Sequence, residues 1–353
     1  MDQPNNKSDS KSNSGRKKKR PIPPTPFEAL HKAMEEFIDL HPPIDRTVLL
    51  SDLPKRWSYY PPLLLLPQTA FSSQEWKQYL EILPPSVLAL FYSKVASSLK
   101  ASQLALNAPI QSTALRSPHI TPLHGNFGPP VSEPPTATDL ANAFWVTTTQ
   151  NGIKQTWAPM YTMFSRGNIT EKTRVLSFPD IEGQDVADLF VGIGYFAFSY
   201  LKAGAKRVWG WDLNPWSVEG LRRGAEMNRW RCDVDPDGVS DAQVVIFNED
   251  NASARRRLGE YGVKVRHVNL GLLPSSRGAW KIAADILDEE GWIHVHGNCR
   301  DTEIEQWSDD VSQEFTALFG TSWTVEIVER FRVKEFGPAI GHWVLDLCCK
   351  HNS

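Results

Sequence analysis

The sequence has few cysteines and no long apolar run. Its 353 residues include four cysteines, which have neither the paired spacing of zinc ligands nor the density of a disulfide-bonded secreted domain. The longest aliphatic run, Leu63–Leu66, is bounded by prolines and is far shorter than the roughly 20 residues that span a bilayer. We therefore expect a protein of a reducing compartment, cytoplasmic, with no membrane segment and no metal site.

A strong excess of charge is also missing, but the charge is unevenly distributed. The first 20 residues hold seven basic and two acidic side chains, which leaves 31 basic and 39 acidic residues in the rest, a net charge of −8. A region with this net negative charge does not bind nucleic acid over its whole surface. A polyanionic partner therefore requires local basic patches or the basic tail. The run Arg16–Arg20 fits a nuclear signal, a tether for RNA or a solvated tail. The other candidate patches are Arg222–Arg223, Arg229 with Arg231, and Arg255–Arg257.

Composition divides the chain into five parts. Polar and basic residues dominate the start, helical apolar spacing follows, and a proline-rich stretch precedes a segment with an Asn151–Gly152 hairpin turn. The predicted parts are a disordered basic tail (1–26), a small helical N-terminal region (27–107), a proline-rich linker (108–140), a β-hairpin with a cofactor-contact segment (141–184) and a Rossmann-like catalytic domain (185–350).

Short apolar runs alternate with helical patterns from residue 185 onward. The expected strands are 186–191, 207–211, 243–247, 263–270, 291–296, 324–331 and 343–348. Helices are expected to begin near residues 194, 215, 252, 276 and 302. This alternation predicts an α/β fold, a doubly wound and mostly parallel sheet whose ligands bind at the carboxyl ends of the strands.

A glycine-rich turn follows the first of these strands. Gly192 and Gly194 form the loop, and Asp212 lies 20 residues beyond Gly192, where an acid binds ribose hydroxyls in dinucleotide sites. Read alone, the loop fits a turn that only allows close packing, an NAD site or an S-adenosylmethionine (SAM) site. The acidic pair Asp250–Asn251 after the third strand favours SAM, because it offers an acceptor to the adenine amine.

Two further strings lie beside this unit. The string Phe164–Arg174 has the sequence FSRGNITEKTR, and the fourth strand ends in NLGLLPSS, residues 269–276. Taken separately, the first fits a solvated turn with a helix start, and the second fits a strand end with Ser276 as the cap of the next helix.

Together these strings resemble the tRNA wybutosine-synthesising protein 2 family. The resemblance rests on FSRGNITEKTRV, DLFVGIGYF, an acid then Asn-Pro after the second strand, the Asp-Asn pair, NLGLLPSS, HVHGN and VLDLCC. It implies a class I SAM-dependent methyltransferase-like fold and transfer of the 3-amino-3-carboxypropyl group of SAM to a ring carbon of 4-demethylwyosine, next to the anticodon of tRNA(Phe). Methylthioadenosine would be released. The helical region and the linker depart from the family's usual N-terminal RNA-binding domain.

The resemblance also implies the site residues. Cofactor contacts carry over to Ser165, Lys172, Asp188, Gly192, Gly194, Asp212, Asp250 and Asn251. The substrate-side candidates are Asn168, Asn269, Pro274 and Ser275. Lys172 is a candidate partner for the carboxylate of SAM.

Several alternatives stay open at this point. A SAM-dependent tRNA methyltransferase and a non-catalytic RNA-binding protein that retains the fold compete with the transferase. His294 and His296 share one face of a strand and fit either a metal or proton-shuttle site or buried, hydrogen-bonded imidazoles. Trp209, Trp211 and Trp216 fit either base stacking or packing. No residue is identified as the catalytic base.

Overall fold

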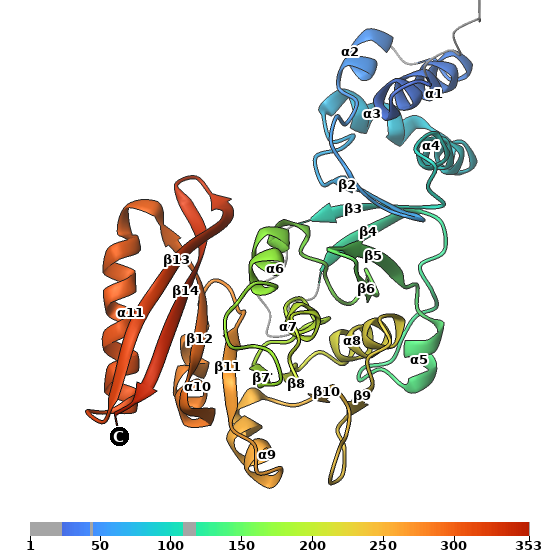
Figure 1. Cartoon of the computed structure of the whole chain (residues 1–353). Coiled ribbons are helices and arrows are strands. Elements are labelled where there is room, and N and C mark those ends of the chain that lie inside the picture. Colours follow the sequence, from blue (N-terminus) through green and yellow to red (C-terminus); the bar gives the residue numbers. More distant parts are fainter. Residues whose placement is uncertain (1–22, 43–44, 109–117, 353) are drawn as a thin grey trace, which may run out of the picture.

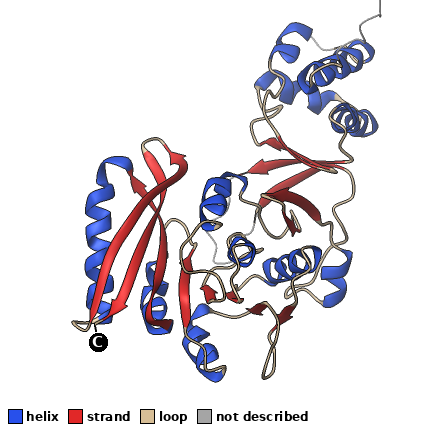
Figure 2. Cartoon of the chain, viewed as in Figure 1, coloured by secondary structure: helices blue, strands red, loops and turns tan. Residues whose placement is uncertain are grey.

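The computed structural model describes residues 23–42, 45–108 and 118–352 (Figure 1). Most of the predicted tail lies outside these ranges, and helix α1 (Pro26–Leu40) begins at its end. The chain folds into an N-terminal α/β unit, a segment with a β-hairpin, and a large sheet with flanking helices (Figure 2). Within the described ranges, no helix combines the length and the apolar character needed to cross a bilayer.

The N-terminal unit differs from the predicted small helical region by containing a four-stranded sheet of order β1-β2-β3-β4. Its strands are β1 (Ser58–Tyr60), β2 (Leu63–Pro67), β3 (Gln103–Ala108) and β4 (His119–His124). Its other helices are α2 (Arg46–Ser51), α3 (Gln74–Ile82) and α4 (Pro85–Ser98). The leucine run is strand β2, and it was missed because so short an apolar run fits a buried helix and a strand equally well.

The proline-rich stretch contains a strand and a helix, although its composition predicts a linker. Strand β4 lies within it and pairs antiparallel with β3 at the edge of the sheet, where a proline such as Pro122 is tolerated. Helix α5 (Ala137–Asn142) ends the stretch, and its N-cap is Thr136, whose side chain forms a capping box with Asp139. Residues 109–117 of the predicted linker lie outside the described residues.

The predicted hairpin is confirmed. Strands β5 (Val146–Gln150) and β6 (Ile153–Trp157) pair antiparallel around Asn151 and Gly152, which have φ values of 53° and 70°. Two positive φ values are what a type I′ turn requires. The 3-10 turn η1 (Arg166–Asn168) and helix α6 (Ile169–Val175) follow.

The large sheet has eight strands in the order β13-β14-β12-β11-β7-β8-β10-β9. The strands are β7 (Asp185–Asp188), β8 (Arg207–Trp211), β9 (Cys232–Val234), β10 (Val244–Phe247), β11 (Val265–Leu270), β12 (Leu287–Arg300), β13 (Trp323–Gly337) and β14 (Ile340–His351). The helices are α7 (Ala197–Lys202), α8 (Pro215–Met227), α9 (Ala254–Glu260), α10 (Trp280–Ile286) and α11 (Ile304–Phe319).

Helices cover both faces of this sheet. Val186 of β7 packs with residues of α7 and α8, whereas the next residue, Ala187, packs with residues of α9, α10 and α11. Since successive strand residues point to opposite faces, the two groups of helices lie on opposite sides. The doubly wound α/β fold is thus confirmed, with β14 antiparallel to both β12 and β13.

One region of the sheet was not predicted. Strand β9 pairs parallel with β10 at the sheet edge, and the segment Asp233–Asp241 begins inside it. Beyond β9 the segment is a loop, and the Val239 side chain on it is fully exposed. Three residues are too few for an apolar pattern to reveal such a strand.

Candidate cofactor site

A cavity of about 480 Å³ opens at the carboxyl ends of β7, β8, β10 and β11. Strand β7 lies between β8 and β11, so the chain reverses its direction of travel across the sheet here, the usual place for a ligand in such folds. The predicted site residues on the cavity wall are Ser165, Asn168, Gly192, Asp212, Asp250, Asn251 and Ser275. Segments separated by more than 100 residues are thereby brought to one wall.

The glycine loop shapes the floor of the cavity. Gly192 and Gly194 have φ values of 55° and 82°, and a Cβ atom on Gly192 would lie 2.5 Å from the Tyr195 ring. Glycine is therefore required at both positions. Gly192 lines the cavity, whereas Gly194 holds the loop, since its carbonyl oxygen accepts a hydrogen bond from Gln155 at 3.0 Å.

Asp212 follows strand β8 and faces the cavity. Its Oδ2 accepts the N–H of Gly192 at 2.9 Å and its Oδ1 accepts the N–H of Asn214 at 2.8 Å. Burial raises the pKa of Asp212 to about 6, against the effect of these two donors. Each carboxylate oxygen keeps a further lone pair, so the group can accept hydrogen bonds from a vicinal diol.

Residues 249–251 lie with Asp212 on the cavity wall, and we call this part of the cavity its acidic end. Asn251 donates through Nδ2 to the Leu189 carbonyl oxygen at 2.8 Å, and Asp250 accepts the N–H of Ala252 at 2.8 Å. Glu249 also lines the cavity and forms an ion pair with Arg257 at 2.8 Å. The sequence reasoning missed Glu249, although it directly precedes the predicted pair.

Five predicted residues do not lie on the cavity wall: Lys172, Asp188, Gly194, Asn269 and Pro274. Asp188 is fully buried at the end of β7, accepts the N–H of Phe190 at 3.2 Å, and has a pKa raised by burial to about 7. Asn269 is paired in register with Asp188 on the neighbouring strand. Pro274 accepts the N–H of Asn298 at 2.9 Å. Asp188, Asn269 and Pro274 therefore contact residues next to the cavity wall without lining the cavity themselves.

Lys172 lies behind the aromatic rings of Phe164 and Tyr195. Its Nζ is 4.7 Å and 5.5 Å from the two ring centroids and donates to Gln155 at 2.7 Å and Gln150 at 3.0 Å. Burial, helped by the positive charge of Lys334, lowers the pKa of Lys172 to about 7. Among the described residues, no carboxylate forms an ion pair with it.

The aromatic wall was only partly predicted. Trp211 lines the cavity and stacks on Phe247 at 5.3 Å, whereas Trp209 is bound to Asp185 and lies elsewhere. Trp216 stacks on Tyr161 at 4.0 Å. The other aromatic side chains of the wall are Phe190, Tyr195 and Phe196. They occur within the glycine-loop string, so their position next to Gly192 was the available signal.

The arginines considered for phosphate binding are largely engaged by carboxylates of the protein. Arg222 and Arg223 share Glu219, at 2.7 Å and 2.6 Å. The remaining ion pairs are Arg222 with Glu226, Arg231 with Asp241, Arg255 with Asp285, Arg256 with Glu249 and Glu260, and Arg257 with Glu249 and Glu260. These clusters therefore carry less free positive charge than their sequences indicate.

Comparisons with known proteins decide the family. The chain is 42% identical over 306 residues to tRNA wybutosine-synthesizing protein 2 of Schizosaccharomyces pombe, a match that covers 84% of this chain and 72% of that protein. The protein of the same name from Saccharomyces cerevisiae is 33% identical over 353 residues, with 85% and 75% covered. Residues 147–311 match the TRM5/TYW2 methyltransferase domain. The chain belongs to the tRNA wybutosine-synthesizing protein 2 family.

Solved structures of this family share the fold. TYW2 of Pyrococcus horikoshii, determined in complex with MeSAdo, superposes with a TM-score of 0.63 at 18% identity, over 92% of this chain and 100% of that one. TYW2 of M. jannaschii, determined in complex with AdoMet, gives 0.56 at 15% identity, over 84% and 100%. A match over 92% of the chain extends well into the N-terminal α/β unit, which therefore belongs to the shared fold.

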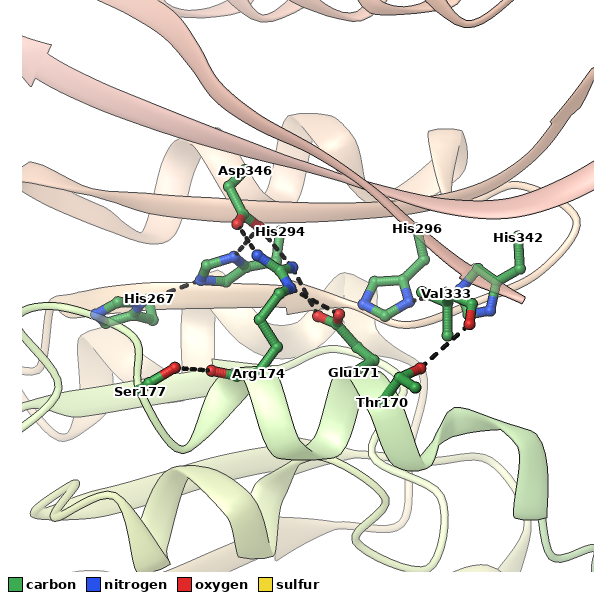
Figure 3. A network of polar contacts seen from close by, with 10 residues as sticks. All are labelled: Thr170, Glu171, Arg174, Ser177, His267, His294, His296, Val333, His342 and Asp346. Carbon is green, nitrogen blue, oxygen red and sulfur yellow. Dashed lines mark hydrogen bonds and ion pairs between the residues drawn. The ribbon is translucent and has the colours of Figure 1, made fainter. Parts of the chain in front are cut away.

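Most of the family string GNITEK lies in helix α6, which buried polar side chains connect to the sheet. We call these side chains the ion-pair cluster (Figure 3): Glu171, Arg174, His267, His294 and Asp346. The Arg174 guanidinium is bound to Glu171 at 2.8 Å and to both oxygens of Asp346. His294 Nδ1 lies 2.7 Å from Asp346, and its Nε2 lies 3.1 Å from His267 Nδ1.

The side chains of this cluster shift one another's pKa values. His294 and Arg174 hold the pKa of Asp346 well below its usual range despite its burial. Burial raises the pKa of Glu171, and the hydrogen bonds from Arg174 oppose that shift. Burial, helped by the neighbouring His294, lowers the pKa of His267 to about 3, so that the His267 ring is neutral.

The two histidines of the HVHGN string are thus buried and hydrogen-bonded, as one of the two interpretations of the sequence held. His294 belongs to the ion-pair cluster, and His296 Nδ1 lies 3.0 Å from His342 Nε2 (Figure 3). Among residues 23–42, 45–108 and 118–352, no group of three or more His, Cys, Asp or Glu side chains is arranged to hold a metal ion.

Proposed function

We propose that this chain transfers the 3-amino-3-carboxypropyl group of SAM to a ring carbon of 4-demethylwyosine in tRNA(Phe) and releases methylthioadenosine. The observation that carries the proposal is the cavity, which joins the acidic residues Asp212 and Asp250 to the segment Ser165–Asn168 in a chain 42% identical to a tRNA wybutosine-synthesizing protein 2. The family resemblance supplies the acceptor base and the choice of tRNA.

The acidic end of the cavity suits adenosine. Asp212 has acceptor capacity for both ribose hydroxyls, and Asp250, at the N-terminus of the turn before α9, has capacity for the exocyclic amine. Trp211 and Phe190 supply apolar surface for the purine ring. No cationic group is needed at the glycine loop, because SAM has no pyrophosphate.

The end of the cavity opposite Asp212 and Asp250 must position SAM so that one particular carbon on its sulfonium reacts. SAM supplies three electrophilic carbons on one sulfur, so the product depends on which of them is held in line with the acceptor carbon. In the transfer proposed here, a carbon–carbon bond forms, the carbon–sulfur bond breaks with its electron pair left on sulfur, and the ring carbon gives up its proton to solvent water. Holding two reactants in line contributes several kcal/mol, about 7 to 11 in the best cases.

Lys172 is suited to hold the carboxylate of the transferred group. It is 3% exposed, its two hydrogen-bond acceptors are neutral amide oxygens, and its Nζ lies 5.5 Å from the ring centroid of Tyr195, a residue that lines the cavity. A buried lysine without a carboxylate partner attracts an anionic ligand strongly, because little water competes for its charge.

One incubation tests the function. Demethylwyosine-containing tRNA is incubated with SAM labelled on the methyl carbon in one sample and on the carboxyl carbon in another. We expect carboxyl label in the tRNA and release of methylthioadenosine. Methyl label in the tRNA would instead identify a methyltransferase, and no label in either sample would favour a non-catalytic RNA-binding protein. A variant with Asp212→Ala should lose SAM binding in the same assay; full retention would contradict the site assignment.

A further inference from the structure

Two cations without carboxylate partners lie at one edge of the cavity. Arg166 belongs to the turn η1 and Lys334 to the end of β13, and in the part of the chain that the structure describes no carboxylate forms an ion pair with either of them. Arg332, two residues before Lys334, is by contrast bound to Asp301 at 2.9 Å. The arginine patches predicted from the sequence are paired in the same way as Arg332. Arg166 and Lys334 therefore differ from them in having positive charge left for a partner.

The topology of the sheet brings Lys334 to η1. Strand β12 runs parallel to β11, and β14 runs antiparallel to β12 and β13, so β13 ends at the edge of the sheet where the cavity opens. Thr170 Oγ1 donates to the Val333 carbonyl oxygen at 3.1 Å, which fixes β13 against α6 (Figure 3). Lys334 Nζ donates to Ser165 Oγ at 3.4 Å. Its side chain crosses Gly167, where a Cβ atom would lie 2.9 Å from Lys334 Cδ.

Arg166 and Lys334 lie at the rim of the cavity. Ser165 and Asn168 line the cavity, whereas Arg166, which lies between them in the sequence, is exposed. Lys334 is partly buried, and this burial lowers its pKa. Lys172 lies deeper, and burial together with the charge of Lys334 lowers its pKa to about 7. Positive charge thus extends from the interior, at Lys172, to the surface, at Arg166.

An exposed aromatic side chain accompanies the two cations. Phe336, two residues beyond Lys334 at the end of β13, is 60% exposed. Burial raises the pKa of Tyr60, and the charge of Arg166 is among the effects that oppose this rise, so Arg166 lies near the N-terminal unit. Cations beside an exposed aromatic ring are typical of surfaces that bind single-stranded nucleic acid, because phosphates bind the cations and bases stack on the ring. We call Arg166, Lys334 and Phe336 the rim patch.

We propose that the rim patch is the docking surface for the anticodon loop of the substrate tRNA, with Arg166 and Lys334 bound to backbone phosphates beside the acceptor nucleotide and Phe336 stacked on a neighbouring base. This inference rests on the proposed function, which places the acceptor base in the cavity. A base that enters the cavity leaves its flanking phosphates at the rim. The acidic excess of the chain beyond residue 20 disfavours RNA elsewhere, so unpaired cations decide where the backbone lies.

The salt dependence of tRNA binding tests the two cations. The full-length protein is titrated with tRNA(Phe) that carries 4-demethylwyosine, and the logarithm of affinity is plotted against the logarithm of salt concentration. Each phosphate contact to a single strand contributes a slope of about 0.7, so Arg166→Met and Lys334→Met should each reduce the slope by about 0.7. This corresponds to an affinity loss of about fivefold at about 0.1 M salt that disappears near about 1 M.

Three further variants sharpen this test. Lys334→Arg keeps the charge and should keep the wild-type slope. Lys350→Met is the matched control, because it removes a lysine that is paired with Glu290 at the other end of the same hairpin, and it should leave the slope unchanged. Phe336→Ala should weaken binding by about fivefold or more at every salt concentration without changing the slope, because stacking does not depend on counterions.

The outcomes separate the docking surface from the function. Wild-type slopes of both Arg166→Met and Lys334→Met would overturn the docking surface, and so would a loss of affinity that persists at high salt in proteins whose thermal unfolding is unchanged. Weaker SAM binding by Lys334→Met with an unchanged tRNA slope would also overturn it, since Lys334 would then hold the carboxylate of SAM. If the slopes fall as expected but the wild type transfers no carboxyl label, the proposed function fails while the docking surface stands.

Discussion

The ion-pair cluster and the pair of His296 and His342 both use one face of β12 and β14, yet only the ion-pair cluster is complete. His294 has a partner on each ring nitrogen, whereas His296, two residues along β12, has a partner on one. The ion-pair cluster joins α6 to the sheet through the charges of Glu171, Arg174 and Asp346. The imidazole pair consists of two buried rings that contact each other. The comparison separates buried charges, which depend on their partners, from a buried neutral pair.

Removing a charge from the complete cluster should have the largest effect. Arg174→Met leaves Glu171 and Asp346 buried without their main partner, so we expect the free energy of unfolding to fall by about 3 to 5 kcal/mol. Denaturant titration measures this change. Arg255→Met is the control, because Arg255 is 73% exposed in its ion pair with Asp285, and such pairs contribute at most about 1 kcal/mol. Equal effects of the two substitutions would contradict the comparison.

Arg174 and Lys172, both on helix α6, differ in whether their partners are charged or neutral. Arg174 is bound by two carboxylates, whereas Lys172 is bound by two amide oxygens and has a pKa lowered by burial to about 7. At pH 8 the lysine is mostly neutral, and the carboxylate of SAM should draw a proton onto it. We therefore expect proton uptake on SAM binding at pH 8 that fades below pH 7, where the lysine is already charged.

Calorimetry in buffers of different ionisation enthalpy measures that uptake. Methylthioadenosine, which lacks the carboxylate, should bind without it, and Lys172→Met should abolish it while weakening SAM binding by about tenfold at pH 7. Identical proton uptake by the wild type and Lys172→Met would exclude the lysine as the carboxylate partner. Since the amino group of SAM also titrates, the difference between the two proteins is the informative quantity.

The sequence predicted the parts of the site that lie within one continuous string. The glycine loop, Asp212 and the Asp250–Asn251 pair are local patterns with a fixed relation to a strand end, and the structure brings them to one wall. The Asn151–Gly152 turn was predictable for the same reason, since two positive φ values restrict the residue choice.

The partners of the two histidines were not predictable, because they depend on strand register. The alternation of His294 and His296 indicated one shared face, but only the antiparallel register of β12 and β14 brings Asp346 opposite the first and places His342 within reach of the second. The N-terminal sheet was missed for a related reason. Strands β2 and β3 pair over about 40 intervening residues, a contact that no local pattern reveals.

The most direct test of the comparison uses the double variant His296→Leu with His342→Leu. Replacing both members of a buried hydrogen-bonded pair by apolar side chains is nearly neutral, so we expect the free energy of unfolding to change by no more than about 1 kcal/mol. The measurement is a denaturant titration of this double variant beside Arg174→Met. The account predicts near wild-type stability for the double variant and a large loss for Arg174→Met. Equal losses in the two variants would contradict it.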